Sequence, residues 1–202
     1  MADIGQSTFI GSDIIIQCDE NWTCCQREQA KAKTDKLNEK CPLNIRKSVS
    51  ARSKRAKKNC CARETGRFIR EMTANPDAAS KKNTTSPCLA EKVKDDWDNG
   101  KKSTRQMGVQ MDHDLEVKLG GPARGTLKAL DEEINGFFGN IVAKNTGDNM
   151  RAKGRTEVES VSLVCKPPCP PPKKSDKNND FSTGKRKKFP KVVSPDRISP
   201  KP

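Results

Sequence analysis

The sequence predicts an α+β fold with a small core, added helices and disordered basic tails. The apolar residues 14–16 are all isoleucine, a residue with strong β preference, and they indicate a strand. Leu89, Val93 and Trp97 recur at helical spacing and indicate a helix with one apolar face. Only 32% of the 202 residues are apolar and 4% are aromatic, so part of the chain is expected to remain unfolded.

The first half of the chain divides into two segments of different composition. Residues 1–43 are expected to hold short strands and a helix over 21–37, where Gln, Glu, Ala and Lys supply good helix propensity. Residues 44–86 are expected to form a basic, poorly ordered arm followed by a loop, because almost nothing apolar separates their first charges and Asn, Ser, Thr and Lys dominate their last part. A short helix over 62–72 is the exception.

The second half is expected to contain the folded domain and then a tail. Residues 87–164 form the predicted domain, since apolar residues are densest between 107 and 142. Residues 165–202 are rich in Pro and Lys and are expected to be extended and disordered.

The charge of the chain favours a polyanionic partner. Lys and Arg number 40 against 26 Asp and Glu, a formal net charge of +14, and basic residues that neutralise phosphates gain affinity by releasing counterions. A basic surface that serves only solubility is the alternative. No amphipathic basic helix and no apolar span of about 20 residues is present, so a membrane is not the expected partner. The expected nucleic-acid-binding residues are Arg46, Lys47, Arg52, Lys54, Arg55, Lys57, Lys58, Lys118 and Arg124.

His113 is the only histidine, which limits the available chemistry. Two-histidine ribonuclease catalysis and a Cys2His2 zinc finger are excluded. As a strand, residues 113, 115, 117 and 119 would share one face, and the charged residues 112, 114, 116 and 118 the other. Phosphodiester hydrolysis needs an oxygen-ligated divalent cation and a base that activates water, and Asp112 beside His113 offers one of each. A partly exposed histidine beside a solvated acidic face is the alternative interpretation.

Four short strings in this region resemble a known family. They are Asp112-His113, Leu119-Gly120-Gly121, residues 127–131 (Leu-Lys-Ala-Leu-Asp) and Ile134-Asn135. Together they resemble the HNH branch of the ββα-metal endonucleases, and more narrowly the nuclease domains at the ends of bacterial polymorphic toxins and type VI secretion effectors. The resemblance covers about residues 107–145, under a quarter of the chain. It implies a small ββα-metal nuclease core.

The resemblance also implies roles for individual residues. His113 would be the general base, Asp112 a metal ligand on the first strand, and Asn135 the second protein ligand on the following helix. Glu116 would ligate the metal or orient the imidazole. The metal would be Mg2+, with Zn2+ or Mn2+ as alternatives. Thr126 stands where the family usually has its middle Asn, and its hydroxyl could cap a helix instead.

The biology implied by the resemblance is that of an antibacterial effector. It would cut DNA or RNA in a target cell and have an immunity protein and a secretion-apparatus component as partners. The N-terminus lacks a charged segment, apolar run and cleavage site in series, so we expect a cytoplasmic protein that leaves its producer by a route other than the Sec pathway.

Residue periodicity supports a helix after the glycine pair. Gly120-Gly121-Pro122 predicts a turn, and a helical pattern is expected to begin at Thr126 and stop at Gly139. The apolar stripe of this predicted helix consists of Leu127, Leu130, Ile134, Phe137 and Phe138.

The nine cysteines favour disulfides or free thiols over zinc. Cys18, Cys24, Cys25 and Cys41 could supply four thiolates, but their spacing is not a usual zinc pattern. The vicinal pairs Cys24-Cys25 and Cys60-Cys61 are typical of disulfides to different partners. Cys165 and Cys169 could close a small loop. We expect two or three structural disulfides or free thiols.

Three functions therefore compete. The leading hypothesis is a metal-dependent endonuclease. The alternative is a non-catalytic basic nucleic-acid-binding protein that uses residues 46–58 and 185–188, and that would be indifferent to chelators and to loss of His113. A disulfide-stapled secreted interaction protein is the third, and reductant would unfold it.

Overall fold

The computed structural model describes residues 6–125, 127–166 and 169, and it has the mixed α+β fold that the sequence predicts. The predicted disordered tail, including the basic residues 185–188, lies outside the described residues except for residues 165, 166 and 169.

The strands are β1 (Gln6–Ile10), β2 (Asp13–Gln17), β3 (Leu43–Asn44), β4 (Val109–His113), β5 (Leu127–Asp131), β6 (Glu157–Val158) and β7 (Ser160–Val164). The helices are α1 (Cys24–Asn38), α2 (Ala51–Ala74), α3 (Pro76–Asn83), α4 (Pro87–Asp98), α5 (Glu132–Gly136), α6 (Gly147–Ala152), the 3-10 turn η1 (Val117–Leu119) and the π-helical η2 (Phe137–Thr146).

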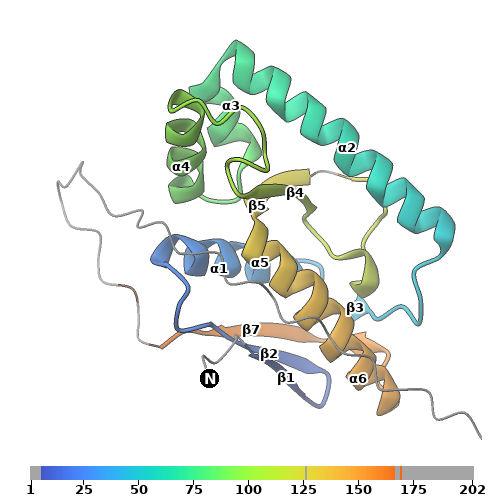
Figure 1. The fold of residues 1–202 in the computed structure, drawn as a ribbon. Coiled ribbons are helices and arrows are strands. Elements are labelled where there is room, and N and C mark those ends of the chain that lie inside the picture. Colours follow the sequence, from blue (N-terminus) through green and yellow to red (C-terminus); the bar gives the residue numbers. More distant parts are fainter. Residues whose placement is uncertain (1–5, 126, 167–168, 170–202) are drawn as a thin grey trace, which may run out of the picture. The chain divides into compact units, whose positions relative to one another are not determined.

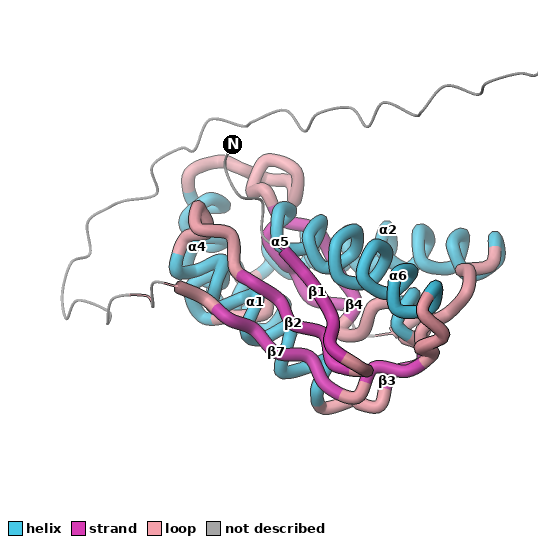
Figure 2. The backbone as a smooth tube through the Cα atoms, turned by 90° about the horizontal axis from the view of Figure 1, so that it is seen from below, coloured by secondary structure: helices cyan, strands magenta, loops and turns pink. Residues whose placement is uncertain are grey.

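A three-stranded sheet joins the two ends of the described chain. β2 lies between β1, its antiparallel hairpin partner, and β7, to which it is parallel (Figure 2). Ile14 and Ile16 point into a core that also contains Leu37 of α1 and Phe138 of η2. The predicted strand at 14–16 is therefore confirmed. Residues of the first predicted segment and of the predicted domain share this core, so a boundary at residue 87 does not separate two compact units.

Residues 44–86, expected to be a poorly ordered arm and loop, are mostly helical. α2 alone has 24 residues, and α3 occupies the part expected to be a loop (Figure 1). Lys and Arg have good helix propensity, so a run of basic residues does not prevent a helix. Four side chains at steps of four residues give α2 a narrow buried face, namely Cys60, Glu64, Phe68 and Met72.

α2, α3 and α4 enclose a second core against β4 and β5. Phe68, Leu89 and Val93 meet Val109 and Leu127 there. An N-cap side chain precedes each of the three helices and accepts a backbone N–H of its first turn; the N-caps are Ser50, Asn75 and Ser86. The predicted helix with Leu89, Val93 and Trp97 on one face is confirmed, and all three residues are buried. Among the described helices, none combines the length and apolar character that a bilayer span requires.

Residues 107–152 differ from the sequence prediction in three places. Residues 127–131 form the strand β5, antiparallel to β4, instead of the first turn of a helix. The helical segment begins at Glu132 behind Asp131, whose carboxylate accepts the Glu133 N–H at 3.0 Å, and it continues past Gly139 to Ala152. β4 also ends at His113, so residues 114–119 do not continue the strand.

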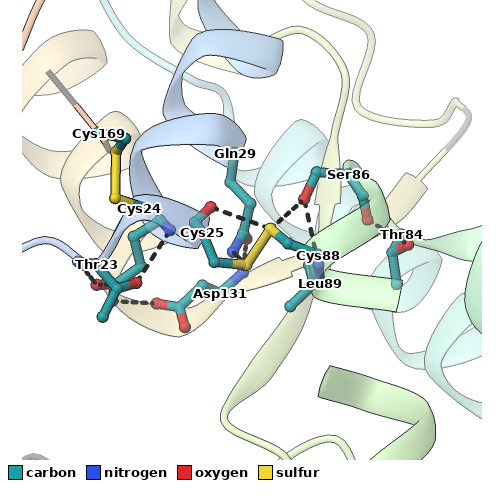
Figure 3. The surroundings of a disulfide bond; sticks show 11 residues. Thr23, Cys24, Cys25, Gln29, Thr84, Ser86, Cys88, Leu89, Asp131 and Cys169 are labelled. Carbon is teal, nitrogen blue, oxygen red and sulfur yellow. Dashed lines mark hydrogen bonds between the residues drawn. A yellow bond between two sulfur atoms is a disulfide. The ribbon is translucent and has the colours of Figure 1, made fainter. Parts of the chain in front are cut away.

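Disulfides attach the start of α1 to two distant segments. Cys24 is bonded to Cys169 and Cys25 to Cys88, which confirms that this vicinal pair has different partners (Figure 3). Cys18 is bonded to Cys165, so the predicted small loop between Cys165 and Cys169 is wrong. The thiols of Cys41, Cys60 and Cys61 are free, so the disulfides expected of the vicinal pair Cys60-Cys61 are absent from the described structure.

Candidate functional site

The candidate site lies at the end of β4, where α1 and α2 approach the strand. Asp112 and His113 are the last two residues of β4, and Glu116 follows in the turn before η1. Lys33 reaches the site from α1 and Lys57 from α2. The first four of these residues are buried, whereas the Lys57 side chain is 38% exposed.

The Lys33 ammonium is enclosed by oxygen atoms of three residues. Its Nζ lies 2.6 Å from Asp112 Oδ2 and 3.4 Å from Glu116 Oε1, and it also donates to the backbone carbonyl of His113. Burial by itself would lower the pKa of Lys33, but the Glu116 and Asp112 carboxylates outweigh it and the pKa is raised. Lys33 is therefore positively charged at neutral pH and compensates the buried carboxylates.

Glu116 is the less well-compensated carboxylate of the site. Burial, and then the charge of Asp112, raise its pKa, while Lys33 and Lys57 act in the opposite direction. The Lys57 ammonium is 3.9 Å from Glu116 Oε2, and Glu116 Oε1 has no hydrogen-bond partner among the described residues. Glu116 Oε1 is therefore ion-paired with the Lys33 ammonium at 3.4 Å but lacks a well-formed hydrogen bond within the described structure.

The His113 imidazole is buried next to the Ala123 backbone. Its side chain is buried, and neither ring nitrogen has a hydrogen-bond partner in the described part of the chain. Burial and the nearby Lys57 ammonium lower its pKa, although the Asp112 charge and the adjacent Ala123 backbone act in the opposite direction. The imidazole is consequently neutral at neutral pH, and one of its nitrogens can accept a proton.

Two cavities meet at His113. One has a volume of about 370 Å3 and the other about 260 Å3, and His113, Asp114 and Lys36 line both. Lys40 lines the larger cavity, while Lys128 lines the smaller one, as do Lys33 and Asp112. Lys128 is the direct cross-strand partner of Asp112. Lysines and the His113 imidazole therefore border the same space, together with Asp114 and with Glu39, which is ion-paired with Lys36 at 2.8 Å.

Sequence reasoning located part of this site and missed the rest. The structure brings together Asp112, His113, Glu116 and Lys57, but Asn135 lies elsewhere: its amide donates to Gln110 Oε1 at 2.6 Å, and it lines neither cavity. Lys33 was missed. It lies on the buried stripe of α1 with Ala30, Thr34 and Leu37, and a lysine on such a stripe was the available signal.

The remaining predicted nucleic-acid-binding residues fall into two groups. Arg46 and Lys118 make structural contacts, because Arg46 Nη2 donates to the Gly120 carbonyl at 2.9 Å and Lys118 pairs with Asp148. The others are exposed: Lys47, Arg124 and, on the first two turns of α2, Arg52, Lys54, Arg55 and Lys58. These four α2 residues make no ion pair with another described residue and are named the α2 basic face below.

The oxygen atoms around the Lys33 ammonium are of the type that binds a hard divalent cation, but they are fewer than such a cation needs. Two carboxylates and one backbone carbonyl converge on one point, and such ligands suit Mg2+. No group of three or more His, Cys, Asp or Glu residues within the described ranges is arranged to hold a metal. Water or substrate oxygens would have to complete the coordination of Mg2+, as is usual for this ion.

Comparison of the chain with protein-family models, with curated proteins and with solved structures finds no match.

Proposed function

We propose that the protein is a metal-dependent endonuclease that hydrolyses phosphodiester bonds in DNA or RNA. The observation that carries the proposal is the neutral, unbonded His113 imidazole beside Asp112, bordering cavities lined by lysines. The strand, strand, helix order of β4, β5 and α5 supports it, since this is the order of a ββα-metal core. The resemblance at residues 107–145 is consistent with that order.

Each residue of the site has a task in this proposal. His113 accepts the proton of the attacking water, because its free nitrogen faces no competing donor. Lys36, Lys40 and Lys128 hold the substrate phosphate in the cavities beside it. Asp112 and Glu116 would hold the cation. When bound, the cation would polarise the phosphate and stabilise the leaving oxygen.

The α2 basic face is the proposed contact with the nucleic-acid backbone outside the cavities. Its four side chains are exposed, and on the same helix Lys57 reaches Glu116. Lys and Arg on an exposed helix can bind phosphates without reading sequence. Substrate held there would lie next to His113.

Neutralising the α2 basic face is expected to weaken binding and its salt dependence together. Changing Arg52, Lys54, Arg55 and Lys58 to Gln should lower the slope of log affinity against log salt by about 0.9 for each lost contact to B-DNA. Fluorescence anisotropy with a labelled duplex at several salt concentrations measures both quantities. The control changes Lys31 and Lys81 to Gln, since these exposed lysines pair with acids on α1 and α3. An unchanged slope would exclude this helix as the contact.

Chelation is the direct test of the proposed activity. Purified protein incubated with supercoiled plasmid and with total RNA should cleave at least one of them in Mg2+ and neither in EDTA. The preferred substrate then identifies the natural one. Binding of nucleic acid without cleavage in every condition would indicate that the protein is a non-catalytic nucleic-acid-binding protein.

That alternative is favoured by one observation. The Lys33 ammonium holds the Asp112 carboxylate, so the site can satisfy its charges without a metal. The α2 basic face would bind nucleic acid whether or not the site is active. The role as an antibacterial effector, with an immunity protein and a secretion component as partners, is proposed only with the nuclease activity, because it rests on the same resemblance.

A further inference from the structure

We propose that the Lys33 ammonium competes with a divalent cation for the same oxygen atoms. These are the oxygens of Asp112, Glu116 and the His113 backbone carbonyl. A metal ion binds there only by displacing the ammonium. The proposal rests on the proposed nuclease function for the role of the metal. It adds a residue outside residues 107–145, carried by α1.

The charges at this point leave room for a second positive charge. Asp112 and Glu116 contribute two negative charges when both are ionised, and Lys33 supplies one positive charge within 3.4 Å of each. Lys57 is more distant and partly exposed. A divalent cation in place of the ammonium would balance both carboxylates. Exchange of one cation for the other is therefore electrostatically reasonable, since buried charges must be compensated.

The side chain of Lys33 has space to leave while α1 remains in place. Lys33 lines the cavity of about 260 Å3, as does Asp114. The helix itself is fixed: Cys25 is bonded to Cys88, and Gln29 accepts the Asp131 N–H at 2.9 Å (Figure 3). Displacement thus requires a change of rotamer and no movement of the helix. The bound ion would face the cavities beside His113.

Removing the ammonium should convert the site into a tighter metal site. In Lys33→Met the carboxylates lose their nearest counter-ion, so the variant should melt at a lower temperature than wild type in EDTA. Saturating Mg2+ or Mn2+ should raise its melting temperature by roughly 5–10 °C, the shift expected for a ligand at about 100 times its Kd on a domain of this size. Wild type should shift much less. Lys31→Met is the matched control, because Lys31 is an exposed lysine on the same helix.

Thermal melting without nucleic acid separates this inference from the nuclease proposal. If Lys33→Met gains the metal-dependent shift and wild type cleaves nothing, the competing site stands and the enzymatic function falls. If wild type cleaves in Mg2+ but Lys33→Met gains no shift, the inference is wrong. Circular dichroism covers the case in which Lys33→Met is unfolded in EDTA. Folding of the variant on addition of Mg2+ would also support the inference, whereas a variant unfolded both in EDTA and in Mg2+ would contradict it. In Lys33→Met/Asp112→Asn the shift should disappear.

Discussion

Replacing His113 by alanine is expected to lower Mg2+-dependent cleavage by at least about 10²-fold, the lower bound of what a positioned general base contributes. His113 is the only histidine, so no second imidazole can replace it. The neutral ring borders the cavities, and both its nitrogens are free within the described structure. The rate of plasmid nicking, or of RNA decay, measured under single-turnover conditions gives the ratio.

The same variant should still fold and bind nucleic acid. Neither ring nitrogen has a well-formed hydrogen bond with a described residue that the substitution would break, and the α2 basic face is on another element. Circular dichroism and anisotropy measurements at low salt check both points. Cleavage at the wild-type rate would show that the base lies elsewhere or that the activity comes from a contaminant.

The sequence was sufficient to predict those helices and strands whose apolar pattern fits only one type of secondary structure. The isoleucine run at 14–16 and the stripe Leu89, Val93 and Trp97 lie where they were predicted. The stripe from Leu127 to Phe138 was ambiguous. Leu127 and Leu130 fit a helical spacing, yet both are buried in β5 because the strand pairs with β4. Local periodicity does not reveal such pairing between distant residues.

The helix predicted over 62–72 is confirmed as part of α2, but the basic first half of α2 was missed for an energetic reason. Its charge density indicated an arm that buries nothing, and its first two turns indeed have no buried side chain. Cys60, Phe68 and Met72 further along the helix provide the burial, and helix formation is cooperative, so the basic turns continue the same helix.

Within the site, the acidic residues and the histidine were predictable but their counter-ion was not. Asp112, His113 and Glu116 are close in sequence and have an unusual composition. Lys33 is 79 residues from Asp112, and lysines on helices are normally exposed. Only the folded structure shows that it compensates these carboxylates.

Gly121→Ala is expected to be among the most destabilising single changes in the protein. A Cβ at this position would lie 2.2 Å from the Leu115 carbonyl oxygen and 2.9 Å from the Glu116 carbonyl oxygen, and these backbone atoms cannot rotate away. Overpacking commonly costs about 1–3 kcal/mol, and a backbone clash belongs at or above the upper end of that range. The melting temperature should fall by about 5 °C or more.

The loss at Gly121 should extend to the site because the same turn positions Glu116. The Gly121 N–H donates to the Glu116 carbonyl at 3.0 Å, so relieving the clash moves the backbone that holds this carboxylate near Lys33. Gly136→Ala is the matched control: its Cβ would meet nothing within 4 Å, and alanine favours the helix by roughly 0.5–1 kcal/mol. Equal melting temperatures for the two variants would show that the turn at residues 115–121 yields more easily than its contacts require.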